Sequence, residues 1–159
     1  MKHAVASCLL AALCIAAGST AAQPVVSYAK AGARIDDVRD DLKQAIESRG
    51  LVIDYQAQIG RMLERTGKDV GSATPLYVDA QTFQFCSAAL SRKAMQADPA
   101  NVTMCPYVLV VYATVQQPDR VIVAYRRPIR HGGSPASSAA LREVDALLDK
   151  IAREAVGRK

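Results

Sequence analysis

Apolar residues recur along the chain at two spacings, one typical of helices and one typical of strands. Residues 35–46 and 141–155 carry an apolar residue every three or four positions, so both stretches are predicted to be helices with one buried face. Asp36 and Asp37 stand at the start of the first stretch, where the helix dipole favours negative charge, and Gly50 follows its end.

The strand signal is strongest in the second half of the chain. Residues 107–114 and 120–126 are rich in Val, Ile and Tyr, and a short polar segment, residues 116–119, lies between them. This pattern predicts a hairpin with a short loop. Alternate side chains of its second strand are expected on opposite faces, with Val121, Val123 and Tyr125 on one face and Ile122 and Ala124 on the other.

The remaining predicted elements complete an alternating order. Short helices are expected at residues 59–66 and 87–97, and further strands at residues 25–28, 51–55 and 82–85. A loop rich in Gly, Ser and Pro is expected at residues 130–138, before the last helix. The order β-α-β-α-β-α-β-β-α predicts an α+β domain, in which an antiparallel-rich sheet packs against helices on one face.

The N-terminus has the pattern of a secretory signal peptide over residues 1–22. Lys2 and His3 form a basic head, residues 4–18 are almost wholly apolar, and small residues follow up to Ala22. The apolar run is shorter than the roughly 20 residues that a membrane span needs. We therefore expect cleavage near Ala22, a single domain over residues 23–159, and a periplasmic or secreted protein.

Cleavage at that point leaves Cys86 and Cys105 as the cysteines of the exported domain. In an oxidising compartment such a pair is read first as a disulfide. The loop that it closes would contribute on the order of 3 kcal/mol in the chain-entropy model. Two free buried thiols, or a metal or haem contact through sulfur, are the alternatives that the sequence leaves open.

Composition narrows the range of partners. Half of the residues are apolar, which is enough for a core, and the formal net charge is +5. The basic residues are not clustered enough to indicate nucleic-acid binding. No apolar run after the signal peptide is long enough to span a membrane. We therefore expect a soluble domain without a nucleic-acid or membrane partner.

Several short segments together resemble one bacterial family, the domain of unknown function 302 family. The segments are residues 49–53 and 61–67, Phe85-Cys86-Ser87-Ala88, Ser91, Asp98-Pro99, Cys105-Pro106-Tyr107, Val111-Tyr112 and Tyr125-Arg126-Arg127-Pro128. Their order and spacing extend the resemblance over residues 25–155, in an exported branch of the family. The resemblance implies a compact α+β fold, related to the TATA-binding-protein-like and Bet v 1-like group and often dimeric. It implies no activity and supplies no catalytic residues.

The residues themselves offer little for catalysis or metal binding. His131 is the one histidine after the signal peptide, and no paired CxxC or HxxxH spacing is present. Cys105-Pro106 occurs in thiolate haem contacts, but a half-cystine entering a strand is the preferred explanation. We expect no metal, no cofactor and no enzymatic activity.

A basic cluster follows the last strand, at Arg126, Arg127, Arg130 and His131. Arginine forks suit carboxylates and phosphates, although a solvated strand end is the preferred interpretation.

Two hypotheses of function follow from these features. The first is a module that binds a small apolar or anionic ligand between the sheet and the long helix, through Tyr107, Tyr112, Tyr125, Arg126 and Arg127. The alternative is a structural or interaction protein of the cell envelope that acts as a homodimer. A third class is redox or metal handling through Cys86 and Cys105.

Overall fold

The computed structural model describes residues 24–158, so the predicted signal peptide lies outside the described residues. Five strands form one open sheet in the order β1-β5-β4-β3-β2, and every neighbouring pair is antiparallel. The elements in chain order are β1 (Val25–Ala31), α1 (Ile35–Glu47), β2 (Ile53–Gln58), α2 (Ile59–Thr66), η1 (Lys68–Val70), β3 (Tyr77–Phe85), α3 (Ala88–Ala97), η2 (Pro99–Met104), β4 (Tyr107–Thr114), β5 (Gln117–Arg126) and α4 (Pro135–Ala155). The predicted fold class and element order are confirmed.

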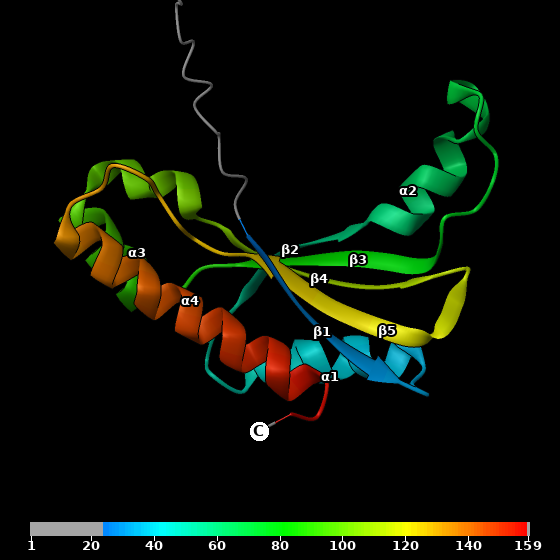
Figure 1. Cartoon of the computed structure of the whole chain (residues 1–159), viewed down its shortest axis with the longest axis horizontal. Helices are drawn as coiled ribbons and strands as arrows, with labels where there is room; N and C mark the ends of the chain where they lie inside the picture. Colours follow the sequence, from blue (N-terminus) through cyan, green and yellow to red (C-terminus); the bar gives the residue numbers. More distant parts are fainter. Residues whose placement is uncertain (1–23, 159) are drawn as a thin grey trace, which may run out of the picture.

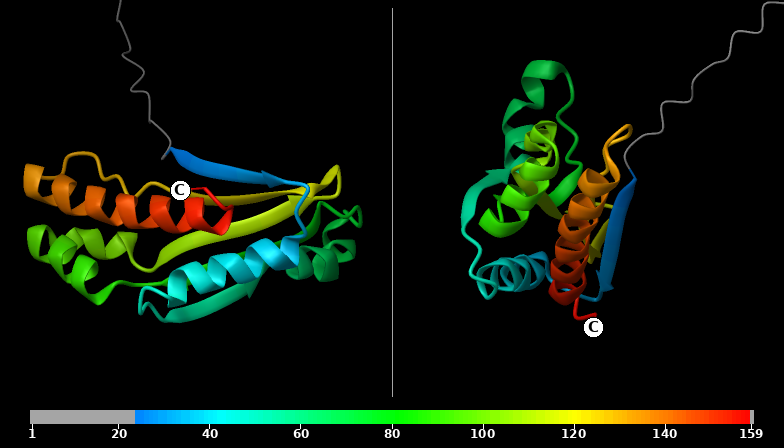
Figure 2. Two further views of the ribbon diagram at one scale, coloured as in Figure 1. Left: turned by 90° about the horizontal axis from the view of Figure 1, so that it is seen from below. Right: turned by 90° about the vertical axis from the view of Figure 1, so that its left-hand side faces the viewer.

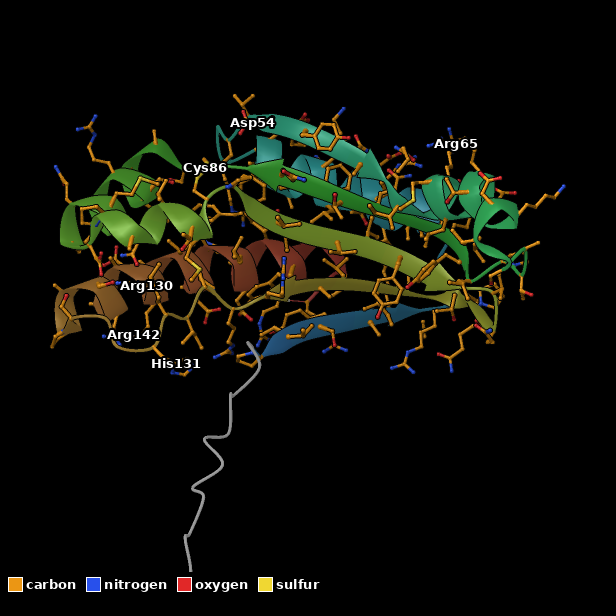
Figure 3. The ribbon with its side chains drawn as sticks, turned by 90° about the horizontal axis from the view of Figure 1, so that it is seen from above. Asp54, Arg65, Cys86, Arg130, His131 and Arg142 are labelled. Atoms are coloured by element: carbon orange, nitrogen blue, oxygen red, sulfur yellow. A yellow bond between two sulfur atoms is a disulfide. The ribbon has the colours of Figure 1, made fainter. Side chains whose placement is uncertain are left out.

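The long helices α1 and α4 lie side by side across one face of the sheet, which we call the covered face (Figures 1 and 2). The opposite face, which we call the open face, has α2 near one end, whereas α3 packs against α4 beyond the other end of the sheet (Figure 1). Among the described residues, no helix crosses the middle of the open face (Figure 3). None of the described helices is long and apolar enough to cross a membrane.

The core lies between the covered face and the two long helices. Strand alternation supplies its sheet side, because every second residue of a strand points to the same face. Its largest members are Phe83, Phe85, Leu109, Val111, Val121, Val123 and Tyr125 from the sheet, Val38, Leu42 and Ile46 from α1, and Val144, Leu148 and Ile151 from α4. The predicted division of β5 into Val121, Val123 and Tyr125 against Ile122 and Ala124 is confirmed by the strand register.

The last helix begins earlier than the apolar spacing predicts. Ser134 caps it by accepting a hydrogen bond from the Ser137 amide at 3.1 Å, and Pro135 occupies its first turn. Both are favoured at helix starts, because a serine hydroxyl satisfies a free amide and proline has none to satisfy. The predicted loop over residues 130–138 is therefore shorter, since its second half is helical.

Four strands differ in their bounds from the prediction, and β1 extends to Ala31 rather than Tyr28. β3 begins at Tyr77 rather than Thr82, and β5 begins at Gln117, inside the predicted loop. β2 runs to Gln58. Near its end, the side-chain amide nitrogens of Gln56 and Gln58 donate to Gln81 Oε1 at 2.6 and 3.2 Å. These polar segments carry no apolar alternation, so their pairing with neighbouring strands is what makes them strands.

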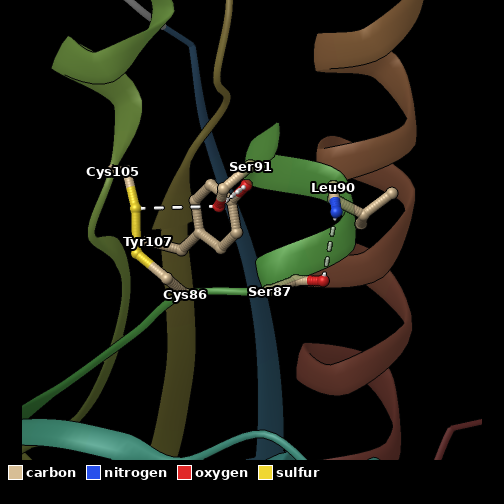
Figure 4. Close-up of a disulfide and its surroundings, with 6 residues drawn as sticks. All are labelled: Cys86, Ser87, Leu90, Ser91, Cys105 and Tyr107. Atoms are coloured by element: carbon tan, nitrogen blue, oxygen red, sulfur yellow. Dashed lines mark hydrogen bonds between the residues drawn. A yellow bond between two sulfur atoms is a disulfide. The ribbon is translucent and has the colours of Figure 1, made fainter. Parts of the chain in front are cut away.

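Cys86 and Cys105 form a disulfide in the structure, as expected (Figure 4). Cys86 follows β3 and Cys105 precedes β4, so the bridge closes the segment that contains α3 and η2. The Ser91 hydroxyl lies 3.7 Å from Cys105 Sγ and 2.9 Å from the Tyr107 hydroxyl. Ser91 on α3 thus contacts both the bridge and Tyr107, the first residue of the central strand.

Candidate functional site

A groove of about 660 Å³ lies on the open face, near the end where β4 begins and β5 ends. Its floor is formed by cross-strand neighbours, since Thr82 pairs with Val110 and Val110 pairs with Ala124. Val108 stands beside this row and faces Arg126 on the neighbouring strand. The floor is therefore mainly apolar, and the regular strand register places it.

The wall at the end of the groove comes from η2. Thr103 and Met104 close this side, and Pro106 leads the chain from there into β4. The Met104 side chain packs against a small cluster that includes Ala94 and Leu141. η2 is not a regular α-helix, and apolar spacing alone did not predict it. The sequence pattern therefore did not indicate these wall residues.

The opposite rim carries two arginines. Arg126 lies on the open face and is exposed, and its side chain forms no ion pair or hydrogen bond with another residue of 24–158. The neighbouring residue Arg127 points toward α4, where its Nη1 lies 3.7 Å from Asp145 Oδ2. The groove thus combines an apolar floor with one uncompensated positive charge and one loosely paired positive charge.

The floor also contains a polar atom without a partner. The Thr82 hydroxyl is buried and forms no hydrogen bond within the described chain. A buried hydroxyl that lacks a partner costs free energy, because its bonds to water are lost and not replaced. Thr82 was not predicted as a site residue, and the strand alternation of β3 would have placed it on this face.

The structure brings four of the five predicted binding residues to this groove, namely Tyr107, Tyr125, Arg126 and Arg127. The two tyrosines reach it from the core side, since both belong to the covered face and are almost fully buried. Burial raises the pKa of the Tyr107 phenol, against the hydrogen bond with Ser91. Burial and the nearby charges of Asp145 and Asp149 raise the pKa of Tyr125 further.

Tyr112 is not part of the groove. The expectation that it faces inward with Tyr107 was wrong, because residues five positions apart on a strand point to opposite faces. Tyr112 stands on the open face, where its ring meets that of Tyr77 edge to face, with centroids 5.8 Å apart. The expected location between sheet and long helix stays a prediction, and Leu148 of α4 and Tyr125 line the groove as well as the core.

Two other features bear on chemistry. Within residues 24–158, no group of three or more His, Cys, Asp or Glu side chains is arranged to hold a metal ion. His131 lies exposed in the loop between β5 and α4 (Figure 3). A second hollow of about 560 Å³ lies beside α2 and the start of β3, and none of the predicted binding residues lines it.

The fold and the groove together define an α+β domain whose antiparallel sheet has one face packed by helices and one face left open. The family model for the Domain of unknown function DUF302 matches residues 27–155, and the chain belongs to this family. The comparison with curated proteins finds no match.

A solved structure supports the fold. It is the crystal structure of an uncharacterized conserved DUF302 protein from Bacillus stearothermophilus, with a TM-score of 0.67 and 12% sequence identity. The similarity covers 82% of this chain and 96% of that chain. At this level of identity the likeness concerns the fold alone.

Proposed function

We propose that this protein is an exported, non-enzymatic module that binds a small amphipathic ligand in the groove on the open face. The groove itself is the observation that carries the proposal. Its volume of about 660 Å³ lies in the range of small-molecule sites, roughly 300–1,000 Å³. Apolar walls with a few polar groups are the usual composition of such sites.

The chemistry of the lining supports an amphipathic ligand. Val108, Val110 and Met104 offer apolar surface to a hydrocarbon portion of the ligand. Arg126 offers an uncompensated guanidinium at the rim, and guanidinium groups bind carboxylates and phosphates through two parallel hydrogen bonds. A polar ligand atom near the floor would also satisfy the Thr82 hydroxyl.

Export is part of the same proposal. The N-terminal pattern supports it, and the Cys86–Cys105 disulfide suits an oxidising compartment. The proposed relation to the TATA-binding-protein-like and Bet v 1-like folds rests on the antiparallel sheet packed against a long C-terminal helix.

Native mass spectrometry of the protein recovered from the bacterial envelope tests this function. We expect a small-molecule adduct that organic solvent releases. Ala124→Leu would place a larger side chain on the groove floor and is expected to abolish the adduct. Ala29→Leu is the matched control, because Ala29 lies on the same face of the sheet but outside the groove. A protein without an adduct that also binds no added amphiphile would refute the proposal.

A homodimer is the second candidate, and it is favoured by apolar side chains on the open face beyond the groove. Tyr112 and Ile122 are neighbours across β4 and β5 on this face, and both remain partly exposed. A second copy that packed on this face would cover them. Light scattering after gel filtration decides between the candidates, since this alternative requires a dimer that Ile122→Lys disrupts.

A further inference from the structure

A hollow of about 340 Å³ adjoins the groove where the chain leaves β5. Arg127 and Pro128 line both the hollow and the groove, so the two are neighbours. Arg130 and Arg142 complete its basic lining, and Ser138 contributes from the start of α4. We call this hollow the arginine pocket. Figure 3 shows Arg130 and Arg142 close together at one end of the molecule, with Arg65 at the opposite end.

The positive charge of the arginine pocket is only partly compensated. Arg130 forms an ion pair with Asp98, yet its Nε is buried without an acceptor. Arg127 lies 3.7 Å from Asp145, whose second carboxylate oxygen has no hydrogen-bond partner. Arg142 is exposed, and its side chain forms no ion pair or hydrogen bond with any described residue. Three guanidinium groups therefore face two carboxylates, and guanidinium donors are left over.

This surplus of donors fits a phosphate monoester better than a carboxylate. One guanidinium fork already occupies both oxygens of a carboxylate. A phosphate monoester has three terminal oxygens and about −1.5 to −2 charges near pH 7, so several arginines and a hydroxyl can bind it together.

We propose that the arginine pocket binds the phosphate of an amphiphile whose apolar chain occupies the adjoining groove. The position of the ligand's apolar chain rests on the proposed function, whereas the phosphate site rests only on the arginines. Arg127 lies between the two parts and contacts the ligand where its chain meets its phosphate.

Isothermal titration calorimetry with three probes tests this assignment. Decyl phosphate carries both the chain and the anion, decyl glucoside carries the chain alone, and inorganic phosphate carries the anion alone. Each probe is titrated into the wild type, Arg142→Gln and Arg65→Gln. Arg65 is the matched control, because it lies on α2, lines neither the groove nor the arginine pocket, and its side chain likewise forms no ion pair or hydrogen bond with a described residue. Circular dichroism verifies that both variants are folded.

We expect decyl phosphate to bind more tightly than either other probe. Arg142→Gln should weaken its binding about tenfold or more, as expected for a charge-assisted hydrogen bond, and should leave decyl glucoside unaffected. Arg65→Gln should change neither affinity. Binding of inorganic phosphate that is sensitive to Arg142→Gln, without binding of either amphiphile, would support a site for free phosphate and refute the groove.

Two results would overturn the phosphate site. If decyl phosphate and decyl glucoside bind equally and Arg142→Gln changes neither affinity, the groove stands and the arginine pocket has no role. If no probe binds, the pocket and the proposed function both fail.

Discussion

Asn101 is almost completely buried where η2 meets α3 and α4. Its amide nitrogen donates to the Ala94 carbonyl and to the Ser137 hydroxyl, both at 2.8 Å. Ser137 is also fully buried, so water cannot replace either partner of this hydrogen bond. One side chain thus joins three segments at the end of the sheet where the groove and the arginine pocket lie.

We predict that Asn101→Ala lowers the free energy of unfolding by about 1–3 kcal/mol, because it leaves buried partners without hydrogen bonds. Urea denaturation followed by circular dichroism measures this loss. Thr103→Ala on the same element is the control, since the exposed Thr103 hydroxyl bonds only the Ala100 carbonyl. Its effect should stay within about 0.5 kcal/mol. Equal effects of the two variants would contradict the assigned role of Asn101.

Asp149 on α4 is a carboxylate whose pKa is lowered by its neighbours. Burial alone would raise its pKa, but hydrogen bonds from Tyr28 and Arg153 outweigh burial, and the pKa lies below its ordinary value of 3.8. A carboxyl group whose pKa is lower in the folded state stabilises that state at pH values above its unfolded pKa. This stabilisation disappears as the pH falls through the folded pKa.

We therefore predict that Asp149→Asn is less stable than the wild type at pH 7, and that the difference shrinks as the pH falls below about 3.8. Urea unfolding at a series of pH values measures the difference. Asp54→Asn is the control, because Asp54 is exposed and forms no ion pair or hydrogen bond with a described residue. A difference that grows at acid pH would show that the sign is wrong.

At the scale of elements, the disulfide closes the segment that carries α3 and η2 between two neighbouring strands of the sheet. The two cysteines are 19 positions apart in sequence. Since η2 provides one wall of the groove, the bridge also restricts where that wall lies relative to β4.

We predict that the double variant Cys86→Ser, Cys105→Ser is less stable than the oxidised wild type by about 3 kcal/mol, as expected for a loop of this length. Urea denaturation with and without dithiothreitol measures the loss. Reductant should destabilise the wild type and leave the double variant unchanged. If reductant leaves the free energy of unfolding of the wild type unchanged, this would contradict a contribution of the bridge to stability.

At the scale of the whole molecule, the strands differ in how they are supported. β4 is central, with β3 and β5 on either side and the long helices on the covered face. β2 is an edge strand, and α2, which follows it, has no buried residue. Stability against local opening should therefore decrease from the centre of the sheet towards β2 and α2.

We predict that amide hydrogen exchange is slowest in β4 and fastest in α2 and η1. Mass spectrometry of exchanged peptides measures this order. Protection of α2 as strong as that of β4 would contradict it, and would instead indicate that a second copy or another partner covers this end of the molecule.

Local patterns were sufficient to predict the class of the fold and the order of its elements. The alternation in β5 and the helical spacing in α1 and α4 depend on residues a few positions apart, and each element buries its apolar side. The arginines at the end of β5 and just after it were also found in this way, because they lie within a few positions of one another. The signal peptide and the site of cleavage remain predictions from the sequence.

Only the tertiary structure decided which distant segments meet. Strand pairing placed β1 beside β5 and made strands of polar segments such as residues 56–58. It also brought η2 and the floor of β3, β4 and β5 together as a groove. Arg142 joined Arg127 and Arg130 because α4 packs against the sheet. These arrangements depend on contacts between residues far apart in sequence, and a local period carries no information about them.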